Sequence, residues 1–253
     1  MSARRPVRGV VSEAVHDATE VVHDASEALQ DAVHEAVEHV TPHLRGWLHL
    51  GMVPLSVVAA AVLLAVTRGS SARTAVLVFG ITAVLLFATS AIYHRGRWDP
   101  RAEGVLKRLD HANIFLIIAG THTPFAVLLL PEGQMRTLLW VVWVGAVAGV
   151  VFRVFWTGAP RWLYTLLYVT LGWVAVFFLV PFWRYGGPTV VSLIATGGLL
   201  YTLGALVYGL KRPNPSPRWF GFHEVFHAFT VVAFATHWTA ALLTVLAHRP
   251  PAA

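Results

Sequence analysis

The sequence predicts an all-α integral membrane protein: a bundle of seven transmembrane helices with a cytoplasmic N-terminus, preceded by an amphipathic N-terminal helix. Three observations support this fold class. Charged residues make up only 13% of the 253 residues and apolar types 56%, whereas soluble domains carry about 25% charged residues. Apolar runs of about 20 residues, long enough to cross the hydrocarbon layer of a bilayer, recur from residue 47 onward. Cationic residues collect on alternate connections between these runs.

Residues 1–44 are expected to form a cytoplasmic, acidic, amphipathic helix. Eight of the 13 acidic residues lie in the first 38 positions. Apolar residues recur there with heptad-like spacing, at Val15, Ala18, Val22, Ala25, Leu29, Ala32 and Ala36. The stripe is thin and rich in alanine. Two interpretations follow: a solvated helix, or a helix that self-associates or packs on a partner.

The transmembrane domain is expected to cover residues 45–249, with a short extracytoplasmic tail over 250–253. Its seven spans are placed near 48–67, 74–94, 110–130, 135–156, 162–183, 189–210 and 222–247. Each span must be helical, because lipid offers no hydrogen-bond partner to a free backbone amide.

The distribution of cations sets the orientation of the bundle. Fourteen Lys and Arg residues lie on the side of the N-terminus and of the second, fourth and sixth connections, and five lie on the other side. Because cytoplasmic loops are enriched in cations, the N-terminus is expected in the cytoplasm and the protein in the cell (plasma or inner) membrane. A nucleic-acid partner is not expected, because the cations lie between apolar runs rather than in a solvated basic domain.

Several polar side chains lie inside the predicted spans, where ionisable groups are costly and indicate function. Ser90 and His94 close the second span one turn apart, Asp110 opens the third, and His223 and His227 open the seventh one turn apart. The predicted topology places them at one depth on the cytoplasmic side. Three imidazoles at one depth predict a metal site. Cysteine is absent, which favours Zn²⁺, with Fe, Ni and Co as alternatives.

Three protein ligands leave a fourth coordination position open, as in catalytic zinc sites. Asp110 is then either the fourth ligand, directly or through water, or a general base. Ser90 is placed to hydrogen-bond the metal-bound water or Asp110. His111 is expected at the membrane interface, and His237 is either a buried, hydrogen-bonded histidine or lines a substrate cavity or proton path.

Helix geometry predicts the direction in which two further side chains point. Glu224 is rotated by about 100° from His223 on a helix, so we expect it to face away from the metal site. Thr121 falls on the same face of the third span as Asp110, so we expect it to line the same cavity. The role of His122 stays open.

The chain resembles the hemolysin III branch of the progestin and adipoQ receptor superfamily. The resemblance rests on Ser-x-x-x-His closing the second span, an Asp opening the third, His-x-x-x-His opening the seventh, and the stretch from Leu109 to Phe125. A Tyr commonly stands in that branch where this chain has His122. The resemblance covers roughly residues 45–247 and implies an N-in seven-helix bundle around zinc. The zinc ligands would be His94, His223 and His227, with Ser90 and Asp110 next to the metal or its water.

Three functional hypotheses follow from the residues and the resemblance. The first is a zinc-dependent intramembrane hydrolase of a lipid amide or ester, because relatives that act as adiponectin receptors resemble ceramidases. The second is a non-enzymatic membrane receptor or membrane-homeostasis regulator with structural zinc. The third, implied by the branch name alone, is a pore-forming, lytic protein. Membrane lipid is the expected substrate or ligand in the first two.

Overall fold

The computed structural model describes residues 42–156 and 158–248, together with the isolated positions 16, 19, 22, 26 and 29. The chain divides into two compact units, Met1–Pro42 and His43–Ala253. In the first unit the five isolated positions are helical and exposed, and they include Val22 and Leu29 of the predicted apolar stripe. Residues 42–44, at the end of the predicted helix, are not helical, and its other positions lie outside the described residues.

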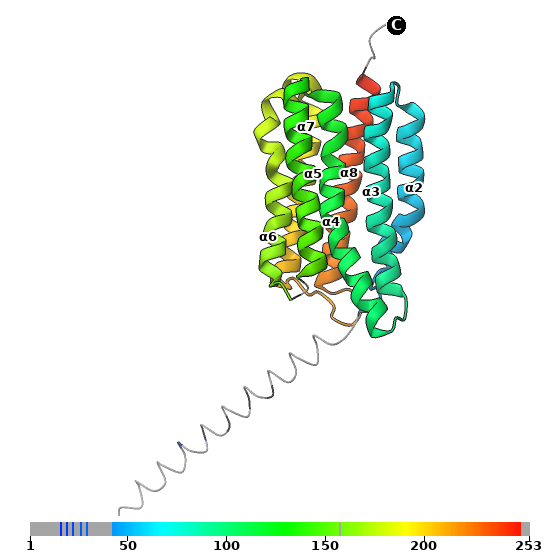
Figure 1. Ribbon diagram of the computed structural model, residues 1–253. Coiled ribbons are helices and arrows are strands. Elements are labelled where there is room, and N and C mark those ends of the chain that lie inside the picture. The colour runs from blue at the N-terminus through cyan, green and yellow to red at the C-terminus, as the bar shows by residue number, and fades with distance from the viewer. Residues whose placement is uncertain are drawn as a thin grey trace, which may run out of the picture. The chain divides into compact units, whose positions relative to one another are not determined.

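The second unit is a bundle of helices that run side by side (Figure 1). Its elements are α2 (Trp47–Val66), α3 (Ser70–Arg95), α4 (Pro100–Leu129), α5 (Glu132–Phe155), α6 (Arg161–Gly172), the 3₁₀ helix η1 (Trp173–Phe178), α7 (Leu179–Leu210) and α8 (Phe222–Ala247). Helix α4 contacts α3, α5, α6, α7 and α8, and is therefore the central helix. The Asp99 side chain caps its N-terminus by accepting hydrogen bonds from the backbone amides of Arg101 and Ala102.

Six helical runs among the described residues are long and apolar enough to cross a membrane. Five of them match predicted spans one to one. The sixth, Arg161–Leu210, is 50 residues long and contains both the fifth and the sixth predicted spans. The count therefore differs from the expected seven because α6, η1 and α7 follow one another without a break in helical assignment.

That long run folds back on itself at Gly187. This residue has non-helical backbone angles, φ 74° and ψ 174°, directly before Pro188. Arg161 Nη1 donates to the carbonyl oxygen of Tyr208 at 3.4 Å, and the Trp173 indole donates to Thr202 Oγ1 at 3.0 Å. A straight helix of 50 residues would be about 75 Å long and could not bring these pairs together, so the chain reverses between them.

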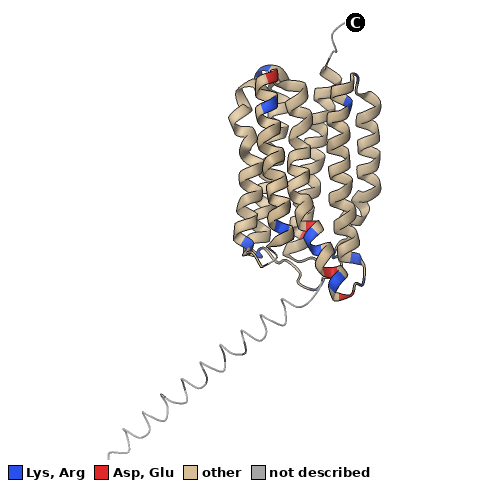
Figure 2. Ribbon diagram, viewed as in Figure 1, with Lys and Arg blue, Asp and Glu red and all other residues tan. Residues whose placement is uncertain are grey.

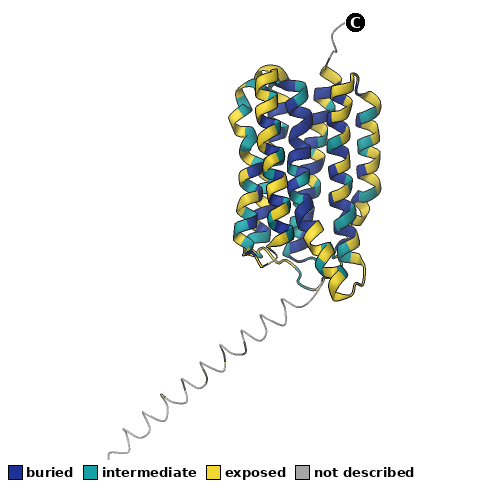
Figure 3. Cartoon of the chain, in the orientation of Figure 1, coloured by how far each residue is buried: buried dark blue, intermediate teal, exposed yellow. Residues whose placement is uncertain are grey.

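The outer surface of the bundle is apolar. Large hydrophobic side chains such as Phe155, Phe177 and Val180 are at least 80% exposed, and exposed positions follow the outer faces of the helices (Figure 3). Lys, Arg, Asp and Glu lie near the two ends of the bundle (Figure 2). An apolar belt between two charged ends fits a bilayer rather than water. The chain is thus a multi-pass helical membrane protein.

Candidate metal centre

Three histidines from two distant parts of the chain meet at one end of the bundle. His94 lies in the last turn of α3, and His223 and His227 lie one turn apart at the start of α8. One ring nitrogen from each lies within 4.8 Å of the other two, and the Nε2 atoms of His94 and His223 are 3.1 Å apart. Two nitrogens bound to a tetrahedral zinc ion are about 3.3 Å apart, from Zn–N distances near 2.0–2.1 Å. The three imidazoles can therefore share one metal ion.

A buried ion pair fixes the start of α8. Glu224 is 1% exposed; its Oε2 accepts from the Gly221 amide at 2.8 Å, and its Oε1 lies 2.5 Å from Arg45 Nε. Glu224 is not in the group of residues that could share the metal, in agreement with the expectation from its rotation on the helix. It holds the first turn of α8, and with it His223 and His227, against the segment that precedes α2.

Asp110 and Ser90 lie beside the three histidines. Asp110 Oδ2 is 3.8 Å from His94 Nε2, too far for a direct hydrogen bond. Ser90 is buried, and its hydroxyl lies next to Asp110, within reach of that carboxylate or of a metal-bound water. The donor set of three imidazoles, with a carboxylate and a hydroxyl beside them, fits zinc.

The structure adds one histidine that the sequence reasoning did not consider. His49, in the first turn of α2, stacks on His227 with ring centroids 3.7 Å apart and an interplanar angle of 15°. It is 2% exposed, and neither ring nitrogen has a hydrogen-bond partner among the described residues. The available signal was a histidine at the cytoplasmic end of the first predicted span, at the same predicted depth as the other three.

His111 is expected at the membrane interface; the structure shows that it is buried between helices, and its depth in the membrane stays a prediction. His111 is 7% exposed; its Nδ1 donates to the Lys107 carbonyl oxygen at 2.7 Å, and its Nε2 lies 3.1 Å from the Tyr208 hydroxyl. The reason is the central position of α4, whose neighbouring faces meet other helices instead of solvent. Asn113, two residues further on, donates to Thr89 Oγ1 of α3 at 2.9 Å.

A cavity of about 220 Å³ extends from His223 and His227 into the bundle. Ser90, Asp110, His49, His223 and His227 line one end, and Thr121, His122 and His237 line the other. The wall between the two ends is mainly apolar and includes Leu86, Ile114, Ile117, Ile118, Leu179 and Ile194.

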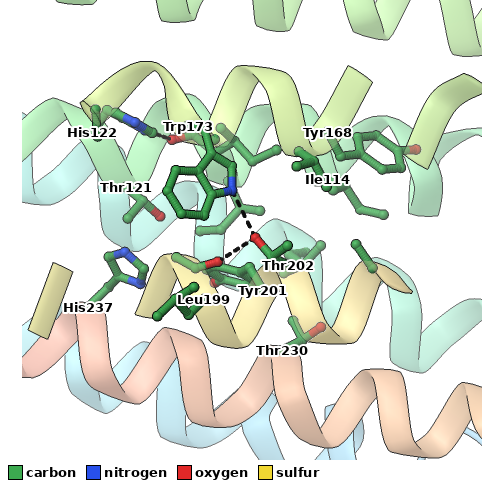
Figure 4. A pocket seen from close by; sticks show the side chains of 18 of the residues that line it. Ile114, Thr121, His122, Tyr168, Trp173, Leu199, Tyr201, Thr202, Thr230 and His237 are labelled. Carbon is green, nitrogen blue, oxygen red and sulfur yellow. Dashed lines mark hydrogen bonds between the residues drawn. The ribbon is translucent and has the colours of Figure 1, made fainter. Parts of the chain in front are cut away.

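The cavity also reaches the outer face of the bundle. Trp173, Val176 and Leu199 line it and are at the same time 42%, 41% and 51% exposed. Figure 4 shows Trp173 reaching across to Thr202 at this side of the cavity. The polar end of the cavity is therefore connected to the apolar surface that faces lipid.

Fold and site together define a class: a multi-pass helical membrane protein with a histidine-rich candidate metal centre at one end of an apolar cavity. More particularly, the chain belongs to the family described as "Haemolysin-III related", whose sequence profile matches residues 37–238. This confirms the resemblance. The chain is 31% identical over 177 residues to "Hemolysin-3" of Bacillus cereus, covering 70% of this chain and 78% of that protein. It is 30% identical over 154 residues to "Hemolysin-3 homolog" of Bacillus subtilis (strain 168), covering 61% and 69%.

Proposed function

We propose that the protein is a zinc-dependent intramembrane hydrolase that acts on an amide or ester of a membrane lipid. One observation carries the proposal: three imidazoles and a carboxylate lie together at the polar end of an apolar cavity that reaches the lipid-facing surface. Such a cavity admits the chain of a lipid and brings a polar linkage near its head to the histidines.

Each residue of the site has a task in this proposal. His94, His223 and His227 would hold the zinc ion, which when bound polarises a carbonyl oxygen and supplies a nucleophilic water. Asp110 Oδ2 accepts the proton of the attacking water and returns it to the leaving amine or alcohol. Ser90, whose hydroxyl lies next to Asp110, orients that carboxylate or the water.

We further propose that the bundle crosses the plasma membrane seven times, with its N-terminus in the cytoplasm. The reversal at Gly187 supports a count of two crossings for the run Arg161–Leu210. The excess of fourteen cations over five supports the orientation. The candidate metal centre then lies at the cytoplasmic end of the bundle.

Hydrolysis of a short-chain ceramide by purified protein in lipid nanodiscs tests the proposed activity. Asp110→Asn and His227→Ala are expected to reduce turnover at least 100-fold, because each removes a group required in the transition state. Glu132→Gln, at an exposed position on α5, serves as the matched carboxyl-to-amide control. Equal turnover by all three variants and the wild type would overturn the proposal.

Two observations favour alternative functions. The 3.1 Å contact between His94 and His223 joins α3 to α8, so a metal there would also serve a non-enzymatic receptor or membrane-homeostasis regulator as a structural tie. That alternative predicts bound zinc without hydrolysis. The name of the relative "Hemolysin-3" favours a lytic protein, which would release a dye from liposomes in proportion to protein dose and independently of metal.

A further inference from the structure

The end of the cavity remote from the candidate metal centre is also polar. His237 lies ten residues after His227 on α8, and Thr121 lies eleven residues after Asp110 on α4. Both spacings place the second polar group roughly 15 Å from the first at 1.5 Å per residue. Thr121 and His237, both labelled in Figure 4, line the same cavity. The cavity therefore has two polar ends, separated by an apolar wall.

Two buried hydroxyl groups at this end, those of Thr121 and Tyr201, have no hydrogen-bond partner among the described residues. Both residues line the same cavity. Buried polar groups in folded proteins are almost always paired with protein or with a bound molecule. Two such hydroxyls in one cavity indicate that something outside this chain pairs with them.

The position of His237 is fixed by close packing. A Cβ atom on Gly197 of α7 would lie 2.3 Å from His237 Cε1 and Nδ1, so only glycine leaves room for the ring. Tyr201 stacks on the ring with centroids 5.6 Å apart, and His237 Nδ1 donates to the Ala233 carbonyl oxygen at 2.9 Å. In the neutral ring, Nε2 is then an acceptor held in a fixed place.

The chemistry of this end selects an uncharged ligand group. The two hydroxyls donate and accept, and His237 Nε2 accepts. Asp110, at the other end, is the only Asp, Glu, Lys or Arg among the residues that line the cavity. A charged group brought here would be buried without a counter-ion, which is strongly unfavourable, whereas a hydroxyl or an amide would find both donors and acceptors.

We propose that Thr121, His122, Tyr201 and His237 form a second polar subsite, which binds a hydroxyl or amide group on the chain of the ligand, about 15 Å from the candidate metal centre. The inference rests on the proposed function in one respect: the cavity takes the chain of a lipid. The subsite would make the protein selective for chains that carry a second polar group at that distance.

Two matched probes test the subsite: dodecanoate and 12-hydroxydodecanoate. An extended chain advances about 1.2 Å per bond, so roughly 12 bonds span the distance between the two ends. The carboxylate cannot enter the uncharged end, which orients both probes the same way. Binding is measured as dissociation constants in lipid nanodiscs, corrected for partitioning into empty nanodiscs.

The wild type is expected to bind the hydroxylated probe at least as tightly as dodecanoate. Without a subsite, moving a hydroxyl from water into an apolar cavity weakens binding by about tenfold or more. Tyr201→Phe and Thr121→Val each remove one unpaired hydroxyl at nearly unchanged size. Each is expected to weaken the hydroxylated probe by about threefold to tenfold, the range of one net hydrogen bond, and to leave dodecanoate unchanged.

Thr230→Val is the matched control, because Thr230 lines the same cavity but its hydroxyl already donates to the Phe226 carbonyl oxygen at 3.0 Å. Its probe ratio should equal that of the wild type. Three results would overturn the subsite. The first is a wild-type preference for dodecanoate of tenfold or more. The others are an unchanged ratio of the two dissociation constants in both subsite variants, and no saturable binding of either probe. Ceramide hydrolysis in the same preparations is scored separately: a retained probe ratio without hydrolysis overturns the proposed activity alone.

Discussion

The ion pair between Arg45 and Glu224 gives a sharp prediction, because it holds the helix that carries two of the three histidines. Replacing Arg45 by Met leaves the Glu224 carboxylate, 1% exposed, with the Gly221 amide as its remaining partner. Removing one partner of a buried ion pair costs about 3–5 kcal/mol. Arg45 is 23% exposed, so water moderates the loss, and we expect Arg45→Met to cost about 3 kcal/mol, at the lower end of that range.

The double variant Arg45→Met/Glu224→Gln distinguishes this explanation from a general loss of packing. The glutamine oxygen can still accept from the Gly221 amide, and no charge is left buried. We therefore expect the double variant to recover about 1–2 kcal/mol relative to Arg45→Met, a non-additivity typical of contacting residues. Zinc content should fall in Arg45→Met and return towards the wild-type value in the double variant.

The assay is thermal and denaturant unfolding in lipid nanodiscs, with elemental analysis of the same samples. The matched control is the Arg136–Glu132 pair at the start of α5, whose side chains are both 70% exposed. Its double variant should change stability by less than about 0.5 kcal/mol. An Arg45→Met protein as stable as the wild type, or strictly additive effects in the double variant, would refute the reasoning.

Three further predictions concern the site and the topology. Purified protein should carry zinc at about one ion per chain by three-imidazole ligation, and His94→Ala should lose it; full zinc content in that variant would exclude this site. His49→Ala should weaken zinc binding about tenfold or more, as removal of groups that orient ligands does. His49→Phe should retain zinc binding, because phenylalanine preserves the stack on His227. Equal zinc binding by both variants would show that the stack does not orient the ligand. Because the chain contains no cysteine, single cysteines can report sidedness: Gln134→Cys should react with an impermeant thiol reagent in intact cells, and Arg97→Cys only after permeabilisation. The reverse pattern would overturn the N-in topology.

Hydropathy located most helices well, because a membrane span is constrained by length and composition together. The first predicted span, 48–67, corresponds to α2 at Trp47–Val66, and the last, 222–247, corresponds to α8 at Phe222–Ala247. Helix α4 begins at Pro100, ten residues before its predicted span. Its first turns are polar and are started by the Asp99 cap, so they carry no hydropathy signal. Helix boundaries and membrane boundaries differ there for a physical reason.

The sequence predicts which residues of the candidate site share a depth in the membrane. It does not predict how each helix is rotated about its own axis, and so which side chains face one another. His94, His223 and His227 share a depth once the topology is assigned, and the structure brings them within 4.8 Å of one another. The burial of His111 and the stack of His49 on His227 depend on which helix faces which. Spacing along one helix does not contain that information.

The placement of the site at the start of α8 and the end of α3, beside a cavity that opens on the apolar face of the bundle, affects how a reaction there would finish. If the protein cleaves a lipid as proposed, the reaction would yield a water-soluble fragment and an apolar one. The first would be released where the helices meet the aqueous phase, and the second beside Trp173 and Leu199, into the bilayer. The two fragments would leave into different phases, so dilution alone would oppose their recombination.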